Sequence, residues 1–207
     1  MKKYLLVLFV FAAVSVNRTA ANILVNGGFE SPVLTNDQVM TSIPGWVIAT
    51  GNIDLVHGQG WVSSEGSQSI DLEGSTIGSI YQIFTTAVGQ EYSFSFNYSD
   101  NPYVGDDSAR VRIIDGNTEA NLVDFTVYGP TGNSPTAMMW QSTNGTFIAT
   151  STSTLIRFDS WNVNNYSSAG TALDNVQVDA IPEPASMMLV LSVLGLLSIK
   201  RLFFSRV

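Results

Sequence analysis

The chain has 207 residues, no cysteine, and 17 acidic against nine basic residues, which gives a formal net charge of −8. An excess of negative charge makes nucleic acid and anionic lipid poor partners, so we expect no nucleic-acid binding and no attraction to anionic lipid. The absence of cysteine excludes a disulfide framework, so the fold must be stabilised by its core.

The first predicted element is a secretory signal peptide over residues 1–21. Lys2 and Lys3 are followed by an apolar run over residues 4–14 and then by small residues up to Ala21. Positive charge, a short apolar core and a small-residue cleavage site, in this order, are typical of an export signal. The run is shorter than the roughly 20 residues of a spanning helix. Cleavage after Ala21 is therefore expected, and an uncleaved membrane anchor is the alternative.

Residues 22–181 are predicted to form one all-β domain. Short runs of alternating apolar and polar residues recur, and the clearest is Tyr92–Tyr98, whose aromatic residues share one face of a strand. Many short strands without a strand–helix rhythm predict an antiparallel β-sandwich or jelly roll. The expected strands are Trp46–Ala49, Ile53–Val56, Ser69–Leu72, Ser79–Phe84, Glu91–Tyr98, Ala109–Ile114, Leu122–Val127, Trp140–Ala149, Thr154–Trp161 and Ala172–Asp179.

Two connections in this domain carry turn signals. Asp115, Gly116 and Asn117 predict a hairpin turn, because an Asp-Gly pair supplies the positive φ angles that such a turn needs. The segment 129–135 begins with glycine and ends with proline, and it is interpreted as a loop.

The last predicted element is a sorting tail over residues 182–207. Pro182, Glu183 and Pro184 precede an apolar stretch over residues 187–199, and a basic cluster follows. A helix over residues 185–199 would be about 22 Å long, against a hydrocarbon core of about 30 Å. This marginal length suits a transient anchor in the inner membrane, with the basic cluster on the cytoplasmic side.

The three parts of this tail resemble the PEP-CTERM sorting signal of Gram-negative bacteria. The resemblance implies recognition of Pro182, Glu183 and Pro184 by an exosortase-type membrane protease, which processes the tail. The alternative is a plain C-terminal membrane anchor, and both place the domain outside the cell.

The two end segments hold most of the positive charge of the chain. One of the 17 acidic residues, Glu183, lies there, together with six of the nine basic residues: Lys2, Lys3, Arg18, Lys200, Arg201 and Arg206. Residues 22–181 are left with 16 acidic residues and three arginines. One interpretation is solubility outside the cell, and the other is that some carboxylates bind Ca²⁺.

Five short stretches of the domain also carry a resemblance. In their order they resemble the choice-of-anchor C family, and they are similar to plant cell-wall domains of unknown function. The resemblance implies a galactose-binding-like jelly roll, the fold of many carbohydrate-binding modules. The stretches are 22–30 (NILVNGGFE), 43–46 (IPGW), 51–56 (GNIDLV), 66–72 (GSQSIDL) and 172–176 (ALDNV).

The residues give little support to catalysis, so we expect no enzyme. His57 is the single histidine, and although Ser63, Ser64 and Asp54 are near it in sequence, no Gly-x-Ser-x-Gly elbow presents a nucleophile. A polysaccharide-acting hydrolase stays as an alternative, because paired carboxylates can hydrolyse glycosides. The acids available for that role are Asp54, Asp71, Glu73, Asp106 and Asp107.

The aromatic residues favour sugar binding, since sugar rings stack their C–H faces on aromatic planes. Trp46 follows a Pro-Gly pair and is assigned to the core. Trp61 lies in a glycine-rich stretch after His57 and is predicted to be an exposed ligand-binding residue, together with Tyr103 and Tyr128.

The resemblance to carbohydrate-binding jelly rolls further implies a structural Ca²⁺ that joins the two ends of the domain. The matching residues are Glu30, after the opening motif, and Asp174, in the closing motif. Ca²⁺ takes oxygen ligands from carboxylates, amides and backbone carbonyls. The alternative is that Asp174 caps a turn and Glu30 lies in solvent.

Together these features predict an exported, non-catalytic protein that binds extracellular polysaccharide at the cell surface or in the matrix. A structural matrix or surface-coat protein without a small-ligand site is a second hypothesis, and the hydrolase is a third.

Overall fold

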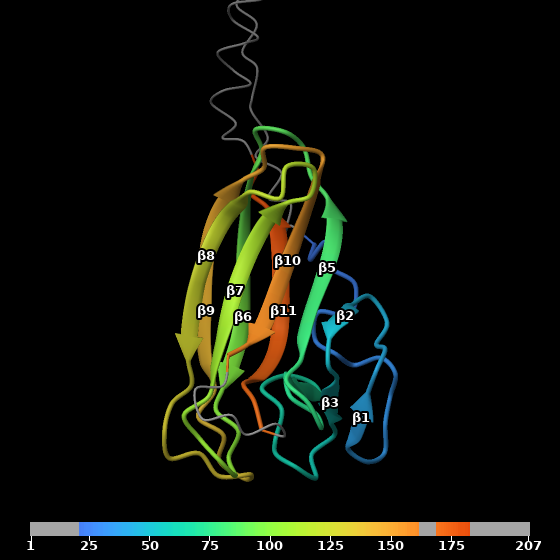
Figure 1. Ribbon diagram of the computed structural model, residues 1–207, viewed down its shortest axis with the longest axis vertical. Coiled ribbons are helices and arrows are strands. Elements are labelled where there is room, and N and C mark those ends of the chain that lie inside the picture. The colour runs from blue at the N-terminus through green and yellow to red at the C-terminus, as the bar shows by residue number, and fades with distance from the viewer. Residues whose placement is uncertain (1–20, 162–168, 183–207) are drawn as a thin grey trace, which may run out of the picture. The chain divides into compact units, whose positions relative to one another are not determined.

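Figure 1 shows the computed structural model, which describes residues 21–161 and 169–182. Nearly all of the predicted signal peptide and of the sorting tail, including Glu183 and Pro184, lies outside the described residues. Ala20–Ile181 form a compact unit, and every strand and the whole core of the described chain lie inside it. Over the described residues, no helix is long and apolar enough to span a membrane.

The described residues form two antiparallel sheets, which confirms the all-β prediction. One sheet has six strands in the order β1-β3-β4-β11-β6-β9, and the other has five in the order β2-β5-β10-β7-β8 (Figure 1). Each predicted strand is present, and the short β1 was not predicted. The strands are β1 (Gln38–Met40), β2 (Val47–Thr50), β3 (Ile53–Val56), β4 (Ser69–Asp71), β5 (Ser79–Thr85), β6 (Glu91–Ser99), β7 (Ser108–Asp115), β8 (Asn121–Tyr128), β9 (Gln141–Ile148), β10 (Ser153–Ser160) and β11 (Ala172–Ala180).

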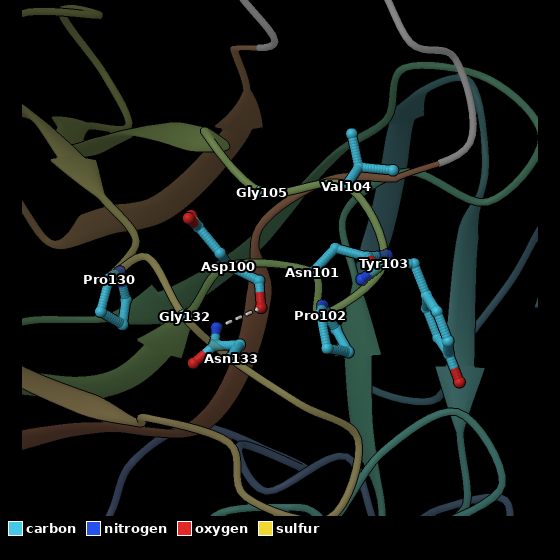
Figure 2. Close-up of a pocket in the computed structure, with 9 residues that line it drawn as sticks. All are labelled: Asp100, Asn101, Pro102, Tyr103, Val104, Gly105, Pro130, Gly132 and Asn133. Atoms are coloured by element: carbon cyan, nitrogen blue, oxygen red, sulfur yellow. Dashed lines mark hydrogen bonds between the residues drawn. The ribbon is translucent and has the colours of Figure 1, made fainter.

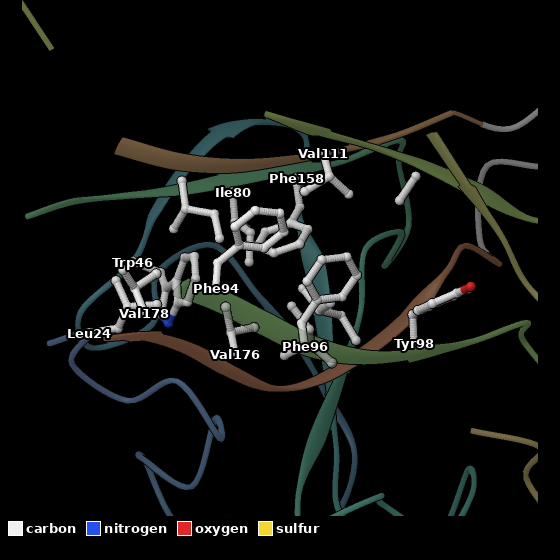
Figure 3. Close-up of a cluster of buried hydrophobic side chains, with 14 of the residues drawn as sticks. Leu24, Trp46, Ile80, Phe94, Phe96, Tyr98, Val111, Phe158, Val176 and Val178 are labelled. Carbon is white, nitrogen blue, oxygen red and sulfur yellow. The ribbon is translucent and has the colours of Figure 1, made fainter. Parts of the chain in front are cut away.

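The core lies between the two sheets, and strand alternation builds it. Along β6 the four aromatic residues are buried, while the three polar residues between them are half-buried on the outer face. Phe96 of β6 meets Phe158 of β10 edge to face, with ring centroids 5.1 Å apart (Figure 3). Trp46 is buried among these residues, as predicted, and its Nε1 donates to the carbonyl of Asn26 at 3.0 Å. Aromatic pairs across the sheets therefore fix their separation.

The hairpin between β7 and β8 is present, but not for the predicted reason. The Asp115 carboxylate accepts the backbone N–H groups of Asn117 and Thr118, at 2.8 and 2.9 Å. The positive φ of the turn is at Glu119, at 60°, and not at Gly116. The loop is longer than a two-residue turn, so the aspartate side chain organises it by accepting backbone hydrogen bonds.

Three connections meet at one end of the sandwich, the lower end in Figure 1. They are residues 57–68 between β3 and β4, 100–107 between β6 and β7, and 129–140 between β8 and β9. The Val62 N–H donates to the Pro135 carbonyl at 3.0 Å, which joins the first connection to the third. This end carries the longest described loops, and it is where the candidate site lies.

Candidate functional site

A pocket of about 140 Å³ lies at this end, between the connections 100–107 and 129–140. Asn133 holds the two together, because its Nδ2 donates to the Ser99 hydroxyl and to the Asp100 carbonyl, both at 2.8 Å. Figure 2 shows the bond to Asp100. The Asn133 Oδ1 accepts the Met139 N–H at 2.8 Å. The polar groups of Asn133 are thus used to shape the pocket. The lining residues are Asp100, Asn101, Pro102, Tyr103, Val104, Gly105, Pro130, Gly132 and Asn133.

Tyr103 is the exposed aromatic residue of this pocket. Its side chain is 65% exposed, yet it is anchored at both ends: the backbone N–H donates to Asn101 Oδ1 at 2.9 Å, and the hydroxyl donates to the Gly60 carbonyl at 3.0 Å. Figure 2 shows the ring pointing away from Asp100 and Pro130. Because the side chain is already held, stacking a sugar on it costs little conformational entropy. The predicted exposure of Tyr103 is confirmed, and its binding role stays a prediction.

Trp61 does not lie on the surface, so the prediction that its side chain is exposed is wrong. It is 3% exposed, and its Nε1 donates to the Ser69 hydroxyl at 2.9 Å. It packs with Val56 and Ala172 in a small apolar cluster that Met138 and Trp140 cover. Val56 and Ala172 belong to the outer face of the six-stranded sheet, so loops fold over that face and bury the indole.

Tyr128 is 69% exposed, but it belongs to a different surface from Tyr103. It ends β8 and pairs with Ser108, whose carbonyl accepts the Trp161 N–H at 2.8 Å. Alternation along β7 directs Val111 and Ala109 to the core and Ser108 outward, so Tyr128 lies on the outer face of the five-stranded sheet. The three predicted ligand-binding residues therefore lie at three different places: Tyr103 lines the pocket, Trp61 is in the buried cluster, and Tyr128 is on the outer face of the five-stranded sheet.

Glu30 binds the loop that precedes β4. Its Oε1 accepts the backbone N–H groups of Ser67 and Gln68 at 2.8 and 2.9 Å, and its Oε2 accepts the Ser67 hydroxyl at 2.8 Å. Burial raises the pKa of Glu30, but the hydrogen bonds from Gln68 and Ser67 outweigh it, and the pKa lies below its ordinary value. The carboxylate is therefore charged and fixed.

Asp174 binds the same loop from β11. Its Oδ2 accepts the backbone N–H groups of Ser64 and Glu65, both at 2.9 Å, and the Ser64 hydroxyl at 3.0 Å, while Oδ1 accepts the Asn175 N–H at 2.7 Å. Burial raises the pKa of Asp174 to about 6 despite these hydrogen bonds. Glu30 lies near the start of the domain and Asp174 lies near its end, so both ends of the domain bind this loop.

Each carboxylate oxygen of Glu30 and Asp174 already accepts a hydrogen bond, so a cation bound here would have to share these oxygens with N–H and O–H donors or displace those donors. In the described part of the chain, no group of three His, Cys, Asp or Glu side chains is placed to hold a metal ion. Calcium at Glu30 and Asp174 requires the loop to turn carbonyl groups inward, and it stays a prediction.

Four acidic residues are buried, Asp71, Glu73, Asp100 and Asp107, and one of them, Asp100, also lines the pocket. Asn101 links two of them, since its Nδ2 donates to Asp71 Oδ2 at 2.9 Å and its backbone N–H donates to Asp107 Oδ2 at 3.1 Å. Burial raises the pKa of Asp107 to about 7 and raises that of Asp71 well above its ordinary value, and neighbouring carboxylates add to both shifts. This cluster fixes the connection that carries Tyr103.

Several of the residues considered for catalysis are hydrogen-bonded elsewhere or buried. The Ser63 hydroxyl donates to the Gly66 carbonyl, and the Ser64 hydroxyl donates to Asp174, so neither is directed at His57. Of the candidate glycosidase acids, Asp71, Glu73 and Asp107 are buried, where a polysaccharide does not reach them. The geometry therefore offers no accessible pair of carboxylates among these three.

The sequence reasoning missed the outer face of the five-stranded sheet. Arg110, Arg112 and Arg157, the three basic residues of the domain, all lie there. The sequence could have predicted part of this surface, because Arg110 and Arg112 are two residues apart in a predicted strand and therefore lie on the same face of the sheet. The position of Arg157 opposite Arg112 depends on sheet pairing, which the sequence pattern does not show.

A solved carbohydrate-binding module has a fold similar to that of this chain. The TmCBM61 module, solved in complex with β-1,4-galactotriose, superposes with a TM-score of 0.52 at 13% identity, covering 78% of this chain and all (100%) of that one. A family 16 carbohydrate-binding module gives a TM-score of 0.49 at 14% identity, covering 76% of this chain and 99% of that one. At 13% identity the likeness to TmCBM61 shows the fold alone.

The family is shown by sequence. Residues 22–179 match the family described as a protein of unknown function (DUF642), and the chain belongs to this family. Halomucin of Haloquadratum walsbyi (strain DSM 16790 / HBSQ001) is 30% identical over 184 residues. That match covers 82% of this chain but only 2% of halomucin, so the chain spans a small part of the length of this relative.

Proposed function

We propose that the chain is an exported, non-catalytic carbohydrate-binding protein of the cell surface or extracellular matrix. The observation that carries the proposal is Tyr103, an exposed aromatic ring held at both ends beside a polar pocket. Such a ring presents a flat apolar face for a sugar, and neighbouring polar groups bind the hydroxyls. The carbohydrate-binding-module fold and the burial of three of the candidate catalytic acids support this function.

The proposed route to the surface depends on the two end segments. The signal peptide exports the chain through the inner membrane, and the tail holds it there until an exosortase-type protease acts at Pro182, Glu183 and Pro184. The resemblance to PEP-CTERM and choice-of-anchor C proteins supports this route. Replacing Pro182, Glu183 and Pro184 by alanine should leave the protein unprocessed in the inner membrane. Fractionation that finds the variant processed and exported like the parent would contradict the sorting proposal.

A glycan-array screen with the domain, residues 22–181, tests the binding function. Specific binding to one glycan class supports the proposal. The absence of binding, together with self-association in solution, would favour a structural matrix protein. Release of reducing ends from a polysaccharide would favour a hydrolase.

A further inference from the structure

Two exposed aromatic residues lie in one row of the five-stranded sheet, on either side of Ser108. Tyr128 of β8 pairs with Ser108 of β7. On the other side, the backbone N–H of Trp161, the residue that follows β10, donates to the Ser108 carbonyl at 2.8 Å. The Ser108 hydroxyl in turn donates to the Trp161 carbonyl. Because β7 lies between β8 and β10 (Figure 1), the two aromatic residues are one strand apart on each side of a small residue.

Strand alternation directs both aromatic side chains away from the core. Val127 is buried in the core, so Tyr128 takes the opposite face of β8. Phe158 is also in the core, and the same alternation places Trp161 on the outer face, three residues later. Tyr128 is 69% exposed and Trp161 is 58% exposed. Neighbouring strands are about 4.8 Å apart, so the two residues, separated by β7, are about 10 Å apart.

The next row along the same strands is polar. It consists of Thr126 on β8, Arg110 on β7 and Asp159 on β10. Residues two apart on a strand share a face and are separated by about 7 Å, so these side chains lie beside the two aromatic residues. The row therefore offers a hydroxyl, a guanidinium and a carboxylate next to two apolar rings.

The charged side chains of this face balance one another. Three arginines lie near three acidic residues: Arg110, Arg112 and Arg157 with Asp124, Asp159 and Glu119. Residues 22–181 contain 16 acidic residues and no basic residue besides these arginines, so the rest of the domain carries negative charge only. An anionic polymer is repelled by such a domain, whereas a neutral ligand meets no net charge on this face.

We infer that Tyr128 and Trp161 bind a neutral, extended polysaccharide, namely a β-1,4-linked chain of hexose residues joined through equatorial bonds. Such a chain is a flat ribbon, and its sugar rings stack their C–H faces on aromatic planes. One hexose residue is about as long as one strand spacing, so the two aromatic residues contact alternate residues of the chain while the residue between them lies over Ser108. The polar row binds the hydroxyl groups along one edge of the ribbon.

The inference goes beyond the proposed function, because it names a second surface and the class of polymer that this surface takes. Neither Tyr128 nor Trp161 lines the Tyr103 pocket. The two sites can therefore be tested separately.

Titration calorimetry with two β-1,4-linked hexasaccharides, cellohexaose and mannohexaose, tests the inference on the domain, residues 22–181. The parent should bind at least one of them about tenfold or more better than maltohexaose, a neutral chain of equal length whose α-1,4 links make it curl. The matching β-1,4-linked disaccharide reaches only one of the two rings, so it should bind about tenfold or more weakly than the hexasaccharide. Added salt should change the affinity little, because the ligand is neutral.

Tyr128→Ala and Trp161→Ala should each weaken hexasaccharide binding about tenfold, because each removes one stacking surface. Tyr128→Phe and Trp161→Tyr should keep most of the affinity, since both retain a ring. Tyr81→Ala is the matched control: it removes an aromatic side chain from the same sheet, in the row of Arg157 and away from the pair, and should leave the affinity unchanged. Melting curves verify the folding of each variant.

Tyr103→Ala separates this surface from the pocket and should leave hexasaccharide binding unchanged. A loss in Tyr103→Ala, with binding kept in Tyr128→Ala and Trp161→Ala, would assign the chain to the pocket; this overturns the inference and supports the proposed function. The inference is also overturned if the parent binds neither β-1,4-linked hexasaccharide, if it binds maltohexaose equally well, or if Tyr81→Ala loses as much affinity as Tyr128→Ala.

Discussion

The Asp174 carboxylate accepts the backbone N–H of Ser64 at 2.9 Å, although the two residues are 110 positions apart in the chain. Asp174 lies on β11, the last strand, and Ser64 lies in the connection between β3 and β4. Glu30, near the start of the domain, binds Ser67 of the same connection at 2.8 Å. One loop therefore joins the two ends of the domain through hydrogen bonds, and Trp61 belongs to the same loop.

The first prediction concerns the strength of this connection. Asp174→Asn replaces an acceptor of several N–H groups by an amide, and it should lower the free energy of unfolding by about 1–3 kcal/mol. Asp179→Asn is the control on the same strand, because Asp179 Oδ1 has no partner among the described residues. It should not lower the free energy of unfolding, because the substitution neutralises a half-buried carboxylate that lacks a hydrogen-bond partner on one oxygen within the described chain. Urea denaturation measures both, and equal losses would contradict the role given to Asp174.

The second prediction concerns calcium. With the Glu30 and Asp174 oxygens engaged by N–H and O–H donors, we expect equal melting temperatures in millimolar Ca²⁺ and in EGTA. A bound metal would instead raise stability by mass action, by about 2.7 kcal/mol at a hundredfold excess over its dissociation constant. A higher melting temperature in Ca²⁺ that is lost in Glu30→Ala would support the calcium site predicted from the sequence.

The third prediction is a loss of stability as the pH rises. Burial raises the pKa of Asp107 to about 7 and that of Asp174 to about 6, above the ordinary value of 3.8. Between pH 3.8 and the raised pKa of each group, the folded state binds more protons than the unfolded state. The free energy of unfolding that these two carboxyl groups contribute is therefore fully present at low pH, and it is lost as the pH rises through the pKa of the folded state. The free energy of unfolding should therefore be lower at pH 8 than at pH 5, by roughly 2 kcal/mol or more.

Asp107→Asn provides the control for this pH dependence. The variant removes one of the titrating groups, so its stability should vary less between the same two pH values. Urea denaturation at both values gives the comparison. A parent that is more stable at pH 8 than at pH 5 would contradict the assignment.

The sequence predicted the strands well, because alternation is a local signal. Tyr92–Tyr98 shows it along the whole of a strand, and β3 matches its predicted bounds. The short strand β1, Gln38–Met40, was missed because its residues are mostly exposed and so lack a clear apolar period.

The site was predicted less well, because its contacts are distant in sequence. The sequence around Trp61 is typical of a loop and predicts exposure of its side chain. Its burial instead depends on contacts with Ala172 and with the loop that carries Met138, and both are far from it in sequence. The exposure of Tyr103 follows from its loop, but its anchoring to Gly60 depends on how two connections meet. The pairing of Arg157 with Arg112 depends likewise on strand order.

The fourth prediction follows from the burial of Trp61. Trp61→Ala should lower the free energy of unfolding by about 3–5 kcal/mol, since it empties the small cluster and removes the hydrogen bond to Ser69. Trp61→Phe should lose less, because the ring still fills most of the space. Urea denaturation measures both variants. Unchanged stability in Trp61→Ala would show that the indole is not packed as described.

The central claim is that Tyr103 presents its ring to a glycan, and calorimetry on Tyr103→Ala measures it most directly. The glycan selected by the array is titrated into the parent, into Tyr103→Ala, and into Tyr103→Phe, which keeps the ring but loses the bond to Gly60. We predict that Tyr103→Ala weakens binding by about 1–3 kcal/mol while the melting temperature barely moves, and that Tyr103→Phe keeps most of the affinity. Equal affinities of the parent and Tyr103→Ala would contradict the account.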